Sequence, residues 1–351
     1  MSQLVLGDRL VGPGQPVYVI AELSANHGGS YERAVELVHL AADAGADAVK
    51  VQTYRPGGMT LDLAQDPFVV SGGTPWDGRT LYDLYAEAMT PWEWHAPLQA
   101  EARQAGVDFF SSPFDAAAVD LLASLGVPAL KIASFELVDH GLIRCAAATG
   151  RPLILSTGMA TAAEIDEAVD VARQAGATGL ALLRCNSAYP APAAEMDLRS
   201  IVDMRARWDV PIGLSDHTLG ATAAVVAVSL GACILEKHFT KSRSEPGPDR
   251  AFSLEPHEFA ALVAAVREAE AAQGGVRYGP SAREQPSVAL RRSLFAVADI
   301  EPGQPFTEDN VRAIRPGAGL APKHLAAILG RRAARGIRRG TPLAWDLVGD
   351  A

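Results

Sequence analysis

Charged and hydroxyl side chains recur inside or at the ends of short apolar runs along most of the chain. Lys50 lies in the run AVKVQ and Lys131 in ALKIAS. Serines end neighbouring runs, with Ser112 in VDFFSS and Ser156 in PLILST. Lysine supplies a point charge and serine a short hydrogen-bond donor, so together they suit a phosphate or carboxylate. A Schiff-base role for one buried lysine is the alternative chemistry.

Two histidines end consecutive apolar runs, His217 after PIGLSD and His238 in CILEKH. Neighbouring strands lie about 4.8 Å apart, so imidazoles at matching strand ends can meet. Such a pair can hold one divalent metal and leave positions open for water and substrate. Glu22, Glu136 and Glu236 are candidate general acid or base groups, and their spacing does not distinguish between them.

The elements that must position these residues are eight apolar runs that alternate with longer amphipathic segments. The runs occupy residues 17–22, 48–52, 107–112, 129–134, 152–157, 180–185, 211–216 and 233–238. Strands that alternate with helices indicate a parallel sheet, and eight such units predict a (β/α)8 TIM barrel. A doubly wound sheet is the alternative, but no glycine-rich dinucleotide fingerprint follows the first run. In a TIM barrel the active site lies at the carboxyl ends of the strands, where the polar residues occur.

The chain changes in character after the eighth run. We expect a TIM-barrel catalytic domain at 1–275, a polar Gly/Pro-rich linker at 276–288 and a small β-rich domain at 289–351. The arginine-rich segment 331–339 fits a solvated surface better than an anion site. The aromatic segment 74–94 suits either a lid over the pocket or local packing.

Composition excludes several classes of protein. A formal net charge of -10 argues against general nucleic-acid binding. The N-terminal sequence MSQLVLGDRL does not resemble a secretory signal, and the apolar stretch 221–235 is too short to cross a bilayer. The three cysteines, Cys145, Cys185 and Cys233, are too few and too widely spaced for a disulfide framework. Cytoplasmic residence is therefore the expectation.

In their order along the chain, these motifs resemble those of the sialic acid synthases, the phosphoenolpyruvate-dependent nonulosonate synthases. The barrel motifs are IAELSANHGGS, AGADAVKVQTY, FFSSPFD, LKIASFE, ILSTGM, CNSAYPAP, IGLSDHT and LEKHFT. SLFAVADIEPG and IRPGAGLAP resemble the antifreeze-like SAF domain, a β-clip fold. The resemblance covers almost the whole chain. It implies a transferase that joins phosphoenolpyruvate to an N-acetylated amino sugar and releases phosphate by C–O cleavage.

The resemblance also implies roles for individual residues. Phosphoenolpyruvate would be bound by Lys50, Gln52, Ser112, Lys131, Ser134, Ser156 and Ser215, with Ser111 as an alternative to Ser112. Sugar-binding residues would be Ser187, Tyr189, Glu236, Asp249 and Arg315. His217 and His238 would hold Mn2+ or Mg2+, Glu22 would assist at the aldehyde or water, and Glu136 would manage protons near phosphoenolpyruvate. Arg315 would reach the partner's barrel in a domain-swapped homodimer.

Substrate preference is suggested by a few variable positions. Ser187 stands where members that use N-acetylmannosamine tend to carry Asn. Together with LSANH, TPWDGRTLYDLY and FSLEP, it is similar to the branch that makes pseudaminic acid from 2,4-diacetamido-2,4,6-trideoxy-L-altrose. The branches that make N-acetylneuraminate or legionaminate are alternatives. A sugar-binding or ice-binding protein without catalysis is the alternative of a different class.

Overall fold

The computed structural model describes residues 3–71, 76–245 and 247–349. The chain forms two compact units that meet in the sequence at Gly274 and Gly275. No helix among the described residues is long and apolar enough to cross a membrane. The three cysteines are free thiols.

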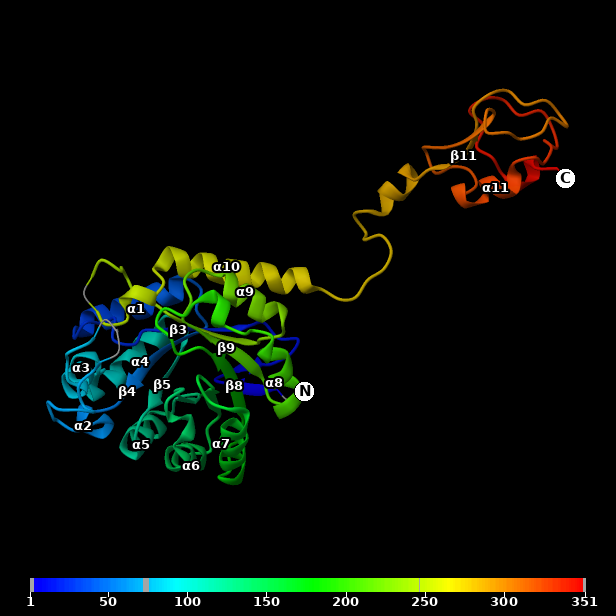
Figure 1. Cartoon of the computed structure of the whole chain (residues 1–351). Helices are drawn as coiled ribbons and strands as arrows, with labels where there is room; N and C mark the ends of the chain where they lie inside the picture. Colours follow the sequence, from blue (N-terminus) through cyan, green and yellow to red (C-terminus); the bar gives the residue numbers. More distant parts are fainter. Residues whose placement is uncertain (1–2, 72–75, 246, 350–351) are drawn as a thin grey trace. The chain divides into compact units, whose positions relative to one another are not determined.

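Among the described residues of the first unit, eight parallel strands close into a barrel (Figure 1). They are β3 (Tyr18–Glu22), β4 (Ala48–Thr53), β5 (Asp108–Pro113), β6 (Leu130–Ile132), β7 (Leu153–Ser156), β8 (Leu180–Cys185), β9 (Ile212–Asp216) and β10 (Ile234–His238). Each strand pairs with the next, and β10 pairs back with β3. The TIM-barrel prediction is confirmed. The run 129–134 is shortened most, because only its central residues join the sheet.

Helices cover the outside of the barrel (Figure 1). They are α1 (Tyr31–Asp43), α4 (His95–Gln104), α5 (Ala116–Leu125), α6 (His140–Ala148), α7 (Ala162–Gln174), α8 (Ser200–Trp208), α9 (Thr222–Ser229) and α10 (Pro256–Gln273). Side-chain oxygens of Ser30, Asp115 and Thr161 cap the first turns of α1, α5 and α7, as the sequence chemistry favours. Two short helices, α2 (Pro56–Met59) and α3 (Leu81–Ala88), lie in the connection between β4 and α4.

Several smaller elements complete the unit. The hairpin of β1 (Leu4–Leu6) and β2 (Arg9–Val11) precedes the barrel and was not predicted. Single 3-10 turns are η1 (Trp92–Trp94), η2 (Glu136–Val138), η3 (Ala193–Glu195) and η4 (Arg250–Phe252). The barrel strands are buried on both faces, which is why they read as nearly continuous apolar runs.

The second unit has a small core of its own. Strands β11 (Ser293–Ala296) and β12 (Val311–Ile314) pair antiparallel, and isolated bridges such as that between Ile300 and Ile337 extend the β structure. Its other elements are η5 (Gln285–Leu290), η6 (Pro322–His324), α11 (Leu325–Ile328) and η7 (Trp345–Leu347). Phe306 and Leu343 are fully buried in this core.

Candidate active site

Lys50 lies among carboxylates in the barrel interior. Its Nζ is 2.5 Å from Oε2 of Glu22, 3.2 Å from Oγ of Ser112 and 3.9 Å from Oε1 of Glu236. The register of parallel strands places Glu22 beside Lys50. Burial lowers the pKa of Lys50, but the carboxylates of Glu22 and Glu236 outweigh it and the pKa is raised. The lysine is therefore held in its charged form.

The choice between the two serines of β5 follows from strand alternation. Ser112 Oγ accepts a hydrogen bond from Lys50, so this side chain faces the site. Ser111 instead donates to the carbonyl of Val51 at 2.8 Å and lies 2.6 Å from Oγ1 of Thr53. Because successive side chains point to opposite faces of a strand, only Ser112 belongs with Lys50.

A second cation lies further round the barrel. Lys131 Nζ donates to Oγ of Ser156 at 2.6 Å and to the carbonyl of Ile132 at 3.1 Å. Burial lowers its pKa, while Glu236 opposes that effect. Lys50 and Lys131 therefore place two buried amino groups on hydroxyl partners, which is the arrangement expected for an anion site.

Next to Lys131 and Ser156, two serines meet over a glycine. Ser134 Oγ lies 2.9 Å from Ser187 Oγ. A Cβ on Gly158 would lie 2.4 Å from Cβ of Ser134 and 3.0 Å from Oγ of Ser187. Gly158 also has a φ of +46°, where a side chain is disfavoured. Two independent reasons thus require glycine here, and neither was recognised in the sequence.

The carboxyl groups of the site differ in their pKa values. Burial raises the pKa of Glu22 to about 7, although Lys50 opposes it. Burial also raises the pKa of Glu136 to about 7. Glu236 accepts a hydrogen bond from Ser215 Oγ at 3.3 Å. Burial would raise the pKa of Glu236, but Lys131 and Lys50 outweigh it and the pKa is lowered. The site therefore holds one carboxylate and two carboxyls that can exchange protons near neutral pH.

The two histidines lie together at the ends of β9 and β10, with ring centroids 5.2 Å apart. Nδ1 of His217 donates to the carbonyl of Asn186 at 2.8 Å, which leaves the lone pair on Nε2. Nδ1 of His238 is buried without a hydrogen-bond partner. Burial keeps the pKa of His238 well below its usual value, so the ring is neutral. Neutral imidazole is the form that binds metal.

These histidines fit a metal ion as two protein ligands rather than as part of a larger cage. Within the described residues, no group of three or more His, Cys, Asp or Glu side chains is arranged to hold one. The other coordination positions would then go to water or substrate oxygens, as in an open catalytic site. The metal therefore remains a proposal.

Sugar-site candidates lie beside the histidines. The ring of Tyr189 is 4.5 Å from that of His217 and 5.1 Å from that of Phe252. Ser24 Oγ donates to Asp249 and accepts a hydrogen bond from Gln52 Nε2 at 3.1 Å. Ser24 thus joins the Gln52 and Asp249 side chains, although sequence reasoning did not single it out.

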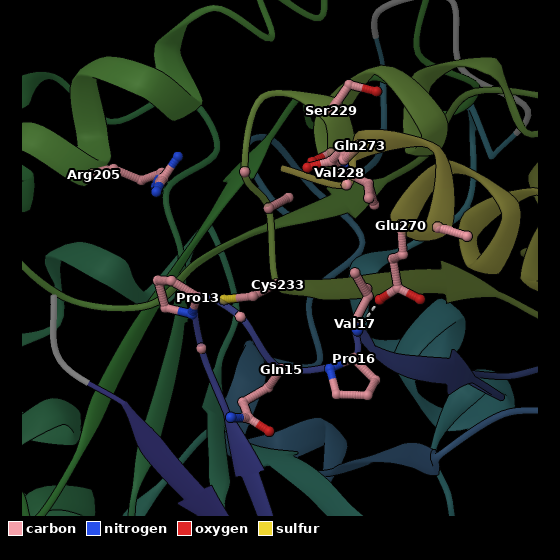
Figure 2. A pocket seen from close by; sticks show the side chains of 16 residues that line it. Pro13, Gln15, Pro16, Val17, Arg205, Val228, Ser229, Cys233, Glu270 and Gln273 are labelled. Carbon is pink, nitrogen blue, oxygen red and sulfur yellow. Dashed lines mark hydrogen bonds between the residues drawn. The ribbon is translucent and has the colours of Figure 1, made fainter. Parts of the chain in front are cut away.

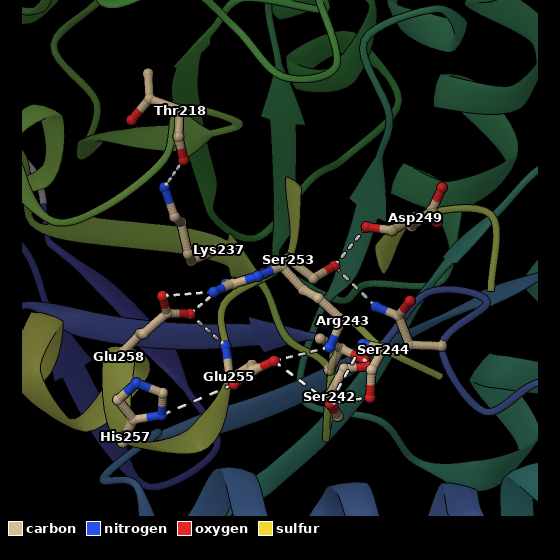
Figure 3. Close-up of polar contacts among 12 residues, drawn as sticks. Thr218, Lys237, Ser242, Arg243, Ser244, Asp249, Ser253, Glu255, His257 and Glu258 are labelled. Atoms are coloured by element: carbon tan, nitrogen blue, oxygen red, sulfur yellow. Dashed lines mark hydrogen bonds and ion pairs between the residues drawn. The ribbon is translucent and has the colours of Figure 1, made fainter. Parts of the chain in front are cut away.

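Asp249 is positioned by a polar network in the loop after β10 (Figure 3). Ser253 Oγ donates to the carbonyl of Asp249 at 2.7 Å. Both terminal nitrogens of Arg243 bind the carboxylate of Glu258, at 2.8 Å for Nη2 and Oε1. The backbone N–H of Arg243 donates to Glu255 at 2.8 Å. This network anchors the loop to the start of α10.

A cleft of about 370 Å³ opens beside these groups. Its polar lining residues Ser24, Gln52, His238 and Asp249 come from β4, the end of β10 and the loops after β3 and β10. Its lining residues Val70, Trp76, Leu81, Leu84, Tyr85 and Ala88 come from the connection after β4. Trp76 and Tyr85 of the aromatic segment 74–94 therefore lie along the cleft. Residues 74 and 75 of that segment lie outside the described residues.

A separate cavity of about 650 Å³ lies at the opposite end of the barrel (Figure 2). Val17 and Cys233, which line it, directly precede β3 and β10. Glu270 of α10 accepts a hydrogen bond from the backbone N–H of Val17 there, as the figure shows. Chemistry in TIM barrels lies at the carboxyl ends of the strands, so this cavity is not the candidate active site.

Apart from Arg315, the predicted site residues thus belong to one barrel. Arg315 follows β12 in the second unit and is exposed. Its role at a sugar site remains a proposal, as do the individual roles of the barrel residues.

Comparison with known proteins defines the class. The NeuB family model matches residues 37–278, and the SAF domain model matches residues 291–349. The chain belongs to the NeuB family, as its motifs indicated, and is accordingly an enzyme of the transferase class.

Several individual relatives are similar to this chain over most of its length. The chain is 43% identical to pseudaminic acid synthase of Helicobacter pylori, over 95% of this chain and 98% of the relative. It is 35% identical to N,N'-diacetyllegionaminic acid synthase of Legionella pneumophila, over 96% of each. A crystal structure of N-acetylneuraminic acid synthetase from Leptospira borgpetersenii, in complex with citrate, has a TM-score of 0.73 and 32% identity. It covers 82% of this chain and 95% of that one.

Proposed function

We propose that this protein is a pseudaminic acid synthase. It would condense phosphoenolpyruvate with 2,4-diacetamido-2,4,6-trideoxy-L-altrose and water, and release pseudaminic acid and phosphate. The observation that carries the proposal is the pair of buried amino groups with hydroxyl partners beside the adjoining rings of His217 and His238. The choice of sugar rests on the 43% identity to the Helicobacter pylori synthase.

Phosphoenolpyruvate would bind across the two lysines. Lys50 and Lys131 supply positive charge, and Ser112 and Ser156 already accept hydrogen bonds from them. Each hydroxyl can donate to an incoming oxyanion, since a serine is donor and acceptor at once. The remaining members of this proposed site are Gln52, Ser134 and Ser215.

The sugar would lie at the mouth of the barrel, against Ser187, Tyr189, Glu236 and Asp249. His217 and His238 would hold a divalent ion, Mn2+ or Mg2+. The hydrogen bond of His217 Nδ1 to Asn186 directs Nε2 to the ion, and the ring of His238 is neutral. When bound, that ion supplies Lewis-acid polarisation of a carbonyl oxygen.

The bond changes require protons near neutral pH. C3 of phosphoenolpyruvate bonds to the aldehyde carbon, whose oxygen becomes the new hydroxyl on gaining a proton. Water adds at C2 and loses a proton. The bond between C2 and the phosphate oxygen then breaks, the C2 hydroxyl becomes the ketone, and its proton leaves with the phosphate. Glu22 and Glu136 have pKa values of about 7 and are suited to these transfers. We assign Glu22 to the aldehyde or water and Glu136 to the phosphoenolpyruvate side.

A second copy of the chain would complete the assembly as a domain-swapped homodimer. Residues 275–351 contain twelve Lys and Arg but seven Asp and Glu, whereas the whole chain has a net charge of -10. The small unit is therefore basic and the barrel acidic, which favours binding of one copy's small unit to the other copy's barrel. Arg315 would contact the sugar's N-acyl group in the partner's site. Cytoplasmic residence stays a prediction.

Phosphate release from phosphoenolpyruvate and Mn2+ tests the proposal, with one candidate sugar in each tube. Release with the altrose-derived sugar alone supports it. Release with N-acetylmannosamine alone, or with its 2,4-diacetamido analogue alone, contradicts the choice of sugar and retains the class. No release with any of the three contradicts the synthase proposal. Borohydride trapping with substrate would capture an imine only if a lysine forms a Schiff base.

A further inference from the structure

Helix α3 has an apolar stripe whose side chains are only half-buried. Leu81, Leu84, Tyr85 and Ala88 follow the i, i+3, i+4, i+7 spacing that places side chains on one face of a helix. None of the eight residues of α3 is buried. Such a stripe normally packs against the protein interior, and Tyr85 does contact the buried ring of Tyr54, with ring centroids 5.8 Å apart. The part of the stripe that stays accessible can contact another molecule.

The accessible part of the stripe faces the cleft at the barrel mouth. All four stripe residues line that cleft, together with Val70 and Trp76. Gln52, His238 and Asp249, from β4, the end of β10 and the loop after it, line the same cleft. The residues from the strands and the loop after β10 can therefore bind hydroxyl and carbonyl groups, while α3 contributes mainly hydrocarbon. A molecule that fills the cleft should itself have polar groups for the former and an apolar group for α3.

We propose that the apolar face of α3 selects a sugar whose far end is a methyl group. This inference rests on the proposed function, in which the sugar lacks a hydroxyl at C6. The aldehyde end faces the histidines, and C6, at the far end of the carbon chain, faces Leu81 and Leu84. A C6 hydroxyl in that position loses its water and gains hydrocarbon neighbours, which disfavours it. Apolar pockets reject an added hydroxyl by about 10- to 100-fold, which sets the expected preference.

The test compares two sugars that differ in a single group. One is 2,4-diacetamido-2,4,6-trideoxy-L-altrose, and the other is the same sugar with its C6 hydroxyl restored. For each, kcat/KM is measured by phosphate release at saturating phosphoenolpyruvate. Leu81→Asn and Leu84→Asn test the stripe, because Asn is close to Leu in shape but offers a donor and an acceptor. Leu61→Asn is the matched control, since Leu61 is exposed in the same connection and does not line the cleft.

The wild type and Leu61→Asn should prefer the deoxy sugar by about 10- to 100-fold. Leu81→Asn or Leu84→Asn should lower that preference at least fivefold, with the KM for phosphoenolpyruvate unchanged. An unchanged preference in both stripe variants would overturn the role of α3 while leaving the proposed function intact. A wild type inactive with the deoxy sugar but active with N-acetylmannosamine would overturn both. The two failures are therefore distinguishable.

Discussion

Replacing Gly158 with alanine should disable the site without unfolding the barrel. The new Cβ would lie 2.4 Å from Cβ of Ser134, whereas ordinary contacts begin near 3.4 Å. Ser134 or the turn must therefore move by about 1 Å. A displacement of that size in a substrate-binding group can cost about 100-fold in rate. The left-handed φ adds a backbone cost of about 1 to 2 kcal/mol to the stability of the variant.

Gly150→Ala is the matched control. Gly150 precedes β7 as Gly158 follows it, and its φ is +71°, but nothing lies within 4 Å of a Cβ placed there. Both variants should lose stability in denaturant titrations, because both force alanine into a left-handed conformation, and Gly158→Ala should lose more because of its clash with Ser134. Only Gly158→Ala should lose about 100-fold in kcat/KM for phosphoenolpyruvate. Equal activity losses in the two variants, or near-normal activity in Gly158→Ala, would refute the steric argument.

Three further predictions concern the histidines, Glu136 and the loop after β10. His217→Ala or His238→Ala should abolish phosphate release while thermal unfolding stays close to that of the wild type, and full activity in either variant would remove the metal site. Glu136 has a folded pKa of about 7 against an ordinary 4.5, so its burial costs no stability below pH 4.5 and progressively more up to pH 7. Glu136→Gln should therefore gain stability over the wild type between pH 5 and pH 8, by at most about 3 kcal/mol, and a constant difference in denaturant titrations would contradict this. Arg243→Met breaks a partly exposed ion pair with Glu258 that is worth about 1 kcal/mol. Because that pair anchors the loop that carries Asp249, the variant should raise the KM for sugar but not for phosphoenolpyruvate. Equal changes in the two KM values would argue against an effect through the loop.

The barrel could be predicted because its strands are buried on both faces. Such strands appear as continuous apolar runs, and a polar residue inside one is therefore conspicuous. Lys50 and Lys131 were found in this way, and the pair of His217 and His238 followed from the expected order of the strands. Strand ends were less certain, since hydrogen bonding to neighbours rather than composition decides where β6 stops.

The small elements were harder to predict. The β1–β2 hairpin has strands of three residues, too short for a periodic signal. The half-buried apolar stripe of α3 could not be predicted either, because a sequence shows that leucines share a helix face but not what that face contacts.

The sequence alone determined the class of site: two lysines, two histidines, three glutamates and a series of serines at the strand ends of one barrel. Only the tertiary structure decided which of these groups meet. It directed Ser112 rather than Ser111 toward Lys50, and it brought Gly158 under Ser134 and Ser187. The sequence gives the type of each side chain, but the pKa and the contacts of that side chain depend on its burial and on neighbours that are distant in the sequence. That is why Glu22 and Glu236, alike as residues, have pKa values shifted in opposite directions.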